Sequence, residues 1–83
     1  MEFTFSKHAK DQFGIRGISL EVVHGIINNP EQIIKDGPCK IIYQRAMTEN
    51  NKKYLYRIFV NICKTPAIVI TGYKTSKIEK YEN

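Results

Sequence analysis

The sequence predicts an α+β domain in which an N-terminal strand and two helices pack on one face of a curved antiparallel sheet of three to four strands. Helical patterns precede Pro30, and β-branched and aromatic residues dominate after it. Short connections between the later segments make neighbouring strands antiparallel. A strand, two helices and then a meander pack as helices on one sheet face, so the opposite face should be left open.

The N-terminal segment predicts a short strand followed by a short helix. Glu2–Phe5 alternates polar and aromatic side chains, as a strand does. Ser6 suits an N-cap because its hydroxyl can accept a hydrogen bond from an amide of the first turn. The helix should end at about residues 13–15, stopped by Gly14 or Gly17.

A second helix is predicted over Leu20–Asn28. Ser19 is its expected N-cap, and Glu21 places an acidic residue in the first turn. Asn29-Pro30 should stop the helix. Its apolar residues recur at the three and four spacing of a buried stripe: Val22, Val23, Ile26 and Ile27.

Four strand-like segments follow Pro30. They cover about Gln32–Lys35, Lys40–Met47, Tyr54–Cys63 and Ala67–Lys74. Turn residues separate these four segments: Gly37-Pro38, Glu49-Asn50-Asn51 and Lys64-Thr65-Pro66. In the third segment alternate residues form one apolar side, so Arg57 should lie on the open face of the sheet.

Composition and charge indicate one globular domain, residues 1–83, with an anionic partner. The chain is 42% apolar and 25% charged. Residues 1–41 carry five Lys/Arg and five Asp/Glu, whereas residues 42–83 carry eight and three, which gives the net charge of +5. Charge on one side of a domain suits a phosphate backbone. The alternative is that the charge only keeps the protein soluble.

Neither a metal, a cofactor nor a membrane is expected. Cys39 and Cys63 fall in strand-like segments and are interpreted as small buried residues in a reducing cytoplasm, with a disulfide as the less favoured alternative. The two cysteines and two histidines lack the paired spacing of a zinc site. Apolar runs such as Ala67–Ile70 are far shorter than a membrane span, and the N-terminus lacks a signal-peptide pattern, so a cytoplasmic protein is expected.

Short motifs lie along nearly the whole chain: His8-Ala9, Arg16-Gly17-Ile18-Ser19, Val22 or Val23, Asn29-Pro30 and the closing Val69–Lys77. With them the sequence resembles a bacterial family of domains of unknown function, family 4258, grouped with the RelE, ParE and BrnT toxins. The resemblance implies a RelE-like fold. For the toxin relatives it implies an endoribonuclease that acts on messenger RNA and is controlled by an antitoxin.

Cleavage of RNA without a metal needs groups that move protons and cations that stabilise the charged phosphorane. Arg57 is the candidate phosphate clamp, Lys74 and Lys77 can hold the phosphate or transfer a proton, and His8 is the candidate general acid or base. These groups are expected to converge in one anion site. Each also has an ordinary alternative, namely a solvated arginine, surface lysines and a structural histidine.

Further residues are candidates for binding RNA rather than cutting it. Lys80 can attract the phosphates, Tyr73 and Tyr81 can stack on unpaired bases, and Arg45 can extend the same surface. Both tyrosines could equally be half-buried packing residues. The expected partners are single-stranded RNA and an acidic antitoxin, and the rival hypothesis is a binding or protein-docking module that does not cut.

Overall fold

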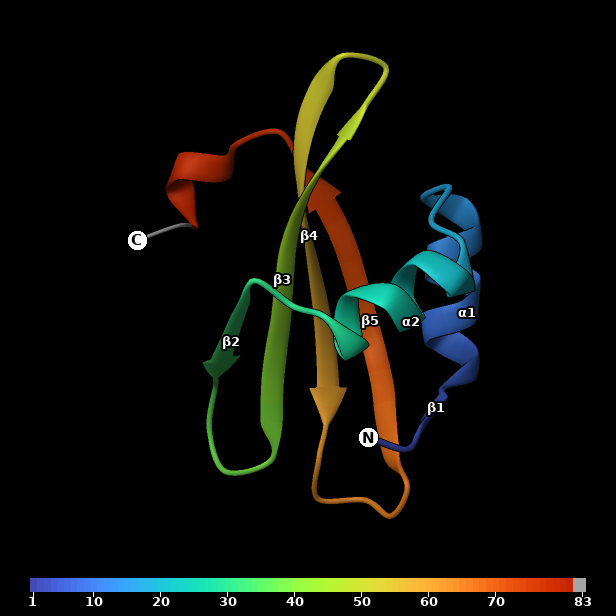
Figure 1. The fold of residues 1–83 in the computed structure, drawn as a ribbon. Coiled ribbons are helices and arrows are strands. Elements are labelled where there is room, and N and C mark those ends of the chain that lie inside the picture. Colours follow the sequence, from blue (N-terminus) through green and yellow to red (C-terminus); the bar gives the residue numbers. More distant parts are fainter. Residues whose placement is uncertain (82–83) are drawn as a thin grey trace.

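A computed structural model describes residues 1–81 as two helices on a five-stranded sheet (Figure 1). The sheet order is β1-β5-β4-β3-β2. The elements are β1 (Phe3–Phe5), α1 (Lys7–Ile15), α2 (Leu20–Asn28), β2 (Gln32–Lys35), β3 (Lys40–Glu49), β4 (Lys52–Asn61), β5 (Ala67–Thr75) and the 3₁₀ turn η1 (Ile78–Lys80).

The α+β class and the two helices are confirmed, but the predicted number of strands is wrong. The sheet has five strands and is mixed rather than antiparallel throughout, because β1 pairs in parallel with the start of β5. Phe3 lies opposite Ala67 and Phe5 opposite Val69. The N-terminal strand therefore forms an edge of the sheet instead of packing on its face with the helices.

Local signals set the bounds of α1. The Ser6 hydroxyl accepts a hydrogen bond from the Ala9 amide at 3.0 Å, as expected of an N-cap. At the other end Gly17 has a φ of +67°, and the Ile18 amide donates to the Phe13 carbonyl at 2.9 Å. This pattern is a Schellman motif, in which glycine takes up the left-handed conformation. Of the two predicted stop residues, Gly17 is the one that ends the helix.

Helix α2 has the predicted bounds. The Ser19 hydroxyl accepts from the Val22 amide at 3.1 Å, and the helix ends before Pro30. Val23, Ile26 and Ile27 are buried as the apolar spacing predicts.

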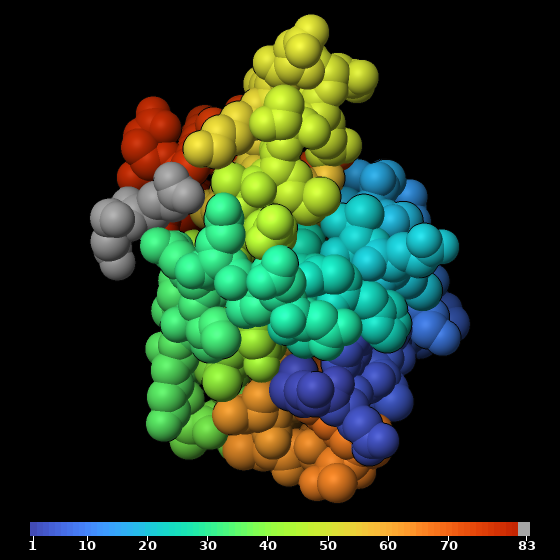
Figure 2. Space-filling view, viewed as in Figure 1, coloured from blue at the N-terminus to red at the C-terminus, as the bar shows by residue number. Residues whose placement is uncertain are grey.

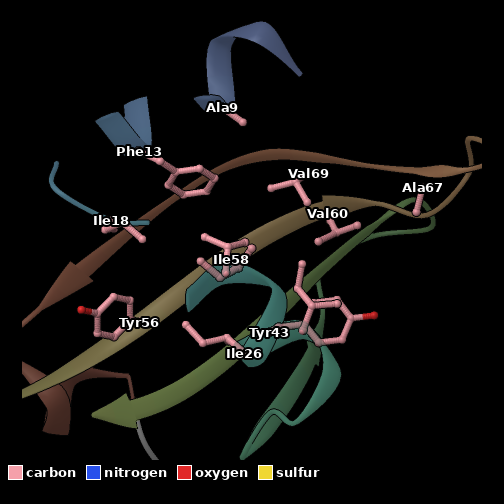
Figure 3. Packing of buried hydrophobic residues seen from close by; sticks show 12 residues of the cluster. Ala9, Phe13, Ile18, Ile26, Tyr43, Tyr56, Ile58, Val60, Ala67 and Val69 are labelled. Atoms are coloured by element: carbon pink, nitrogen blue, oxygen red, sulfur yellow. The ribbon is translucent and has the colours of Figure 1, made fainter. Parts of the chain in front are cut away.

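The core lies between the helices and one face of the sheet. Figure 3 shows Phe13, Ile18 and Ile26 directed at side chains of the central strands, among them Ile58 and Val60. Phe13 and Ile58 are fully buried. An added Cβ at Gly72 of β5 would lie 2.7 Å from Phe13 and 2.9 Å from Ile58, so α1 packs closely on β5 only because residue 72 has no side chain.

The pairing of β4 with β5 shifts by one residue. Val60 lies opposite Val69, whereas the preceding residue, Phe59, lies opposite Thr71. Ile70 is therefore the extra residue of a β-bulge, and the alternation of faces along β5 is reversed after it. As a result Gly72 is directed at the helices, and Tyr73 lies on the opposite face.

Cys39 and Cys63 form a disulfide, so the interpretation of both as separate buried thiols is wrong. Neither residue is inside a strand. Cys39 precedes β3 and Cys63 follows β4, and pairing of these strands from Lys40 and Asn61 onward brings the two Cα atoms to 5.1 Å. That separation suits a disulfide.

In the space-filling view the β3–β4 hairpin projects beyond the helices, and the C-terminal segment lies beside it (Figure 2). Within residues 1–81, no helix is long and apolar enough to cross a membrane. The same residues contain no cluster of three or more His, Cys, Asp or Glu side chains suited to a metal ion.

Candidate nucleic-acid interface

Four polar side chains form a row across the sheet face opposite α1 and α2. Strand pairing places Gln32 of β2 opposite Gln44 of β3, Gln44 opposite Arg57 of β4, and Arg57 opposite Tyr73 of β5. Since directly paired residues project from the same face, all four belong to one surface. We call this surface the Arg57 face and include in it Phe59 of β4, two residues along the same strand.

Arg57 is on the open face, as predicted, and is half-buried among polar and aromatic groups. Its Nε donates to Gln44 Oε1 at 2.5 Å, and its Nη1 donates to the Tyr73 hydroxyl at 2.7 Å. The guanidinium carbon lies 5.5 Å from the ring centre of Phe59 and 5.8 Å from that of Tyr73. A guanidinium has five N–H donors, so donors remain that can bind a phosphate.

Tyr81 covers Arg57 from the C-terminal segment. Its ring centre is 4.2 Å from the guanidinium carbon, well within the range of a cation–π contact. Figure 1 shows η1, which precedes Tyr81, on the other side of the strands from α1. Hydrogen bonding to Tyr73, followed by the charges of Lys80 and Arg57, lowers the pKa of Tyr81, and its partial desolvation opposes this effect.

Lys74 belongs to a different cluster. It lies opposite Tyr56, which is part of the core beneath the helices, and so projects from the face away from Arg57. Its Nζ is 3.1 Å from Glu49 Oε1, and the Tyr56 hydroxyl donates to the same carboxylate. The hydrogen bond from Tyr56, followed by that from Lys74, lowers the pKa of Glu49, while burial and the bond to Glu49 raise the pKa of Tyr56.

Arg45 also lies on the helix side of the sheet. It is paired with Tyr56, and its Nη1 donates to the carbonyl of Asn29, the C-cap of α2, at 2.9 Å. A cation at the C-terminus of a helix is favourable. The expectation that Arg45 extends the surface of Arg57 is therefore wrong, because Gln44 occupies that position on β3.

His8 and Lys77 are both exposed, but they lie in different places. His8 is in the first turn of α1, whose N-cap Ser6 contacts the Ile70 carbonyl on β5. Lys74 is four residues after Ile70 on β5, so it lies about 14 Å along the strand from the contact of Ser6. Lys77 lies between the end of β5 at Thr75 and the start of η1 at Ile78.

The structure thus brings together some of the candidates and separates others. Arg57, Tyr73 and Tyr81 are in contact, and Lys80 lies 5.5 Å from the Tyr81 ring centre. His8, Lys74 and Arg45 do not join this group, so the expected convergence of all the cations is not observed. Sequence reasoning assigned no role to Gln32, Gln44 and Phe59. Gln44 directly follows the apolar run Ile41–Tyr43 on β3, and a polar side chain at such a place is itself a signal of a polar contact.

The geometry defines a small α+β domain with a cationic and aromatic surface on its sheet. Residues 5–74 match the family model described as Domain of unknown function (DUF4258), and the chain belongs to this family. No curated protein and no solved structure matches the chain significantly.

Proposed function

We propose that this chain is a RelE-like domain that binds single-stranded RNA on its Arg57 face. The observation that carries the proposal is a guanidinium surrounded by the rings of Phe59, Tyr73 and Tyr81. Arginine binds phosphate through a planar set of donors, and aromatic rings stack on unpaired bases. The positive charge of residues 42–83 supports this choice, because it attracts a polyanion.

The proposal includes membership of the RelE/ParE/BrnT-like superfamily. The support is the order of elements, a strand and two helices followed by an antiparallel meander, together with the sequence motifs. An RNA target places the protein in the cytoplasm, where thiols are kept reduced. RNA binding should therefore persist when the Cys39–Cys63 disulfide is reduced, which a binding assay with and without a reductant measures.

Fluorescence anisotropy with a labelled single-stranded RNA at low salt tests the binding. Tyr73→Ala should weaken binding about 5- to 150-fold, since a stacked base contributes about 1–3 kcal/mol. Arg57→Ala should reduce the slope of log affinity against log salt by about 0.7, the value for one phosphate contact in a single strand. Lys10→Ala, which removes one exposed charge from α1, is the matched control and should have little effect. Equal affinity for all four proteins would contradict the proposed interface.

Endoribonuclease activity is the second candidate, and the lowered pKa of Tyr81 next to Arg57 favours it. In this scheme the Tyr81 phenolate accepts the proton of the RNA 2′-hydroxyl, and the 2′-oxygen attacks the adjacent phosphorus. The bond from phosphorus to the 5′-oxygen breaks, and that oxygen takes a proton from Lys77 or Lys80. Arg57 stabilises the phosphorane. No metal takes part.

A denaturing gel of the same RNA, incubated in EDTA, separates binding from cleavage. Cleavage predicts fragments with a 2′,3′-cyclic phosphate, and Tyr81→Phe should abolish them while RNA is still bound, because the ring that can stack is retained. RNA that is bound by the wild-type protein yet remains full length decides for the binding module. RNA that is cut equally by Tyr81→Phe excludes Tyr81 as the base.

An acidic antitoxin belongs to the toxin form of this proposal. Such a partner would neutralise the cations of the Arg57 face and cover its aromatic rings. Inducible expression of the chain alone should then arrest growth, and Arg57→Ala should relieve the arrest at equal protein level. Harmless accumulation of the wild-type protein with intact total RNA would leave the binding module as the better description.

A further inference from the structure

Gln44 is fully buried on the sheet face that α1 and α2 do not cover. Apart from the tyrosines, it is the one buried residue with a polar or charged side chain among residues 1–81. Burial of a primary amide is unfavourable unless its donors and acceptor are satisfied. A residue of this kind at the centre of the Arg57 face therefore needs a specific explanation.

The partners of Gln44 fix the orientation of its amide. Its Nε2 donates to Gln32 Oε1 at 2.7 Å, and its Oε1 accepts from Arg57 Nε at 2.5 Å. An amide nitrogen only donates and an amide oxygen only accepts, whereas a guanidinium has no acceptor. Reversal of the Gln44 amide would thus place donor against donor at Arg57, so Arg57 fixes the observed orientation. Gln32 Oε1 accepts from the Nε2 that this orientation presents.

The same contacts hold the plane of the guanidinium. Gln44 binds Nε on one side of Arg57, and Tyr73 binds Nη1 at 2.7 Å on the other. An exposed arginine has many rotamers, and immobilising one on binding reduces affinity. Here two neighbouring strands hold the side chain. Within residues 1–81 no hydrogen bond uses Nη2 or the second N–H of Nη1, so these are the donors offered to a ligand.

We propose that Gln44 is a positioning residue, which fixes the Arg57 guanidinium in advance so that its outer edge binds one phosphate group of a single-stranded RNA. This inference rests on the proposed function and adds how the surface reaches its affinity. Gln32 has a supporting part, because its side-chain Oε1 accepts from Gln44 Nε2 and so helps to hold the Gln44 amide in place. The charge that meets the phosphate remains that of Arg57.

Loss of positioning and loss of charge have different signatures. Gln44→Leu removes the acceptor at Arg57 Nε but no charge, so RNA affinity should fall about two- to twelve-fold with an unchanged salt slope. Arg57→Ala should instead reduce the salt slope by about 0.7. A purely structural glutamine would lower the melting temperature and leave the affinity of the folded protein unchanged.

The experiment compares wild type, Gln44→Leu and Arg57→Ala by anisotropy with labelled RNA at several salt concentrations. Nitrogen-15 NMR of the Arg57 Nε–H group gives an independent readout, and its slow exchange with water in the wild type should be lost in Gln44→Leu. Gln12→Leu is the matched control, since Gln12 is a half-buried residue of α1 outside the Arg57 face. Circular dichroism checks that each variant folds.

Gln32→Leu keeps the test valid if Gln44→Leu does not fold. Gln32 is half-buried on the edge strand, and the substitution removes the second hydrogen-bond partner of the Gln44 amide. A smaller loss of affinity at constant salt slope is expected. If the wild-type protein does not bind RNA, the proposed function and this inference both fail. If it binds and Arg57→Ala weakens binding, but folded Gln44→Leu or Gln32→Leu binds as wild type does, the positioning role alone is refuted.

Discussion

Replacement of Gly72 by alanine should destabilise the fold, because the site has no space for a methyl group. The added Cβ would lie 2.7 Å from Phe13 Cε1, 2.9 Å from the Arg57 carbonyl oxygen and 2.9 Å from Ile58 Cδ1. Phe13 and Ile58 are fully buried, and the third atom belongs to the backbone of β4, so none of the three can move without disturbing its surroundings. Overpacking of this kind costs about 1–3 kcal/mol.

Thermal and urea unfolding, followed by circular dichroism, measure the effect. A loss of about 2 kcal/mol corresponds to a fall in Tm of about 8–16 °C for a domain of this size. Gly25→Ala is the matched control: no atom lies within 4 Å of its added Cβ, and Gly25 is inside α2. It should stabilise the protein by up to about 1 kcal/mol, since alanine is the better helix former. If Gly72→Ala were as stable as wild type, the close packing of α1 on β5 would be refuted.

Two further predictions concern the cross-links of the β3–β4 hairpin. Reduction of the Cys39–Cys63 disulfide, which joins residues 24 positions apart, should lower the free energy of unfolding by about 3.5 kcal/mol on the loop-entropy relation. Urea unfolding with and without a reductant measures this change, and an unchanged midpoint would contradict it. Glu49→Gln should destabilise the protein at neutral pH. The pKa of Glu49 is lower in the folded protein than its value of 4.5 in the unfolded chain, so ionised Glu49 stabilises the folded state at pH values above 4.5. The greater stability of the wild type should disappear as the pH falls through the lowered pKa of Glu49, where the carboxylate is protonated. At alkaline pH it should disappear as the pH rises through the raised pKa of Tyr56, where the donor to Glu49 loses its proton. A wild-type advantage that is constant from pH 2 to 7 would show that the Glu49 contacts with Tyr56 and Lys74 do not stabilise the fold.

Local signals were sufficient for most elements of the fold. The hydroxyls of Ser6 and Ser19 cap the helices where the sequence predicts, and the bounds of α2 are those predicted. What local patterns do not contain is the pairing of distant segments. The parallel pair of β1 with β5 joins Phe3 to Ala67, and the disulfide joins the far ends of two strands, so both depend on the register of the assembled sheet.

The candidate site shows the same limit at the level of single residues. Simple alternation from the buried Val69 would place Lys74 with Arg57 and direct Tyr73 at the helices. The extra residue at Ile70 reverses this arrangement, so that Tyr73 binds Arg57 and Lys74 pairs with Glu49 on the helix side. The basic tail, which reads as a cluster of lysines, therefore contributes the rings of Tyr73 and Tyr81 to a surface around Arg57 of β4. The geometry therefore offers one held cation beside aromatic rings, and the proposed binding of an unpaired nucleic acid strand rests on that combination.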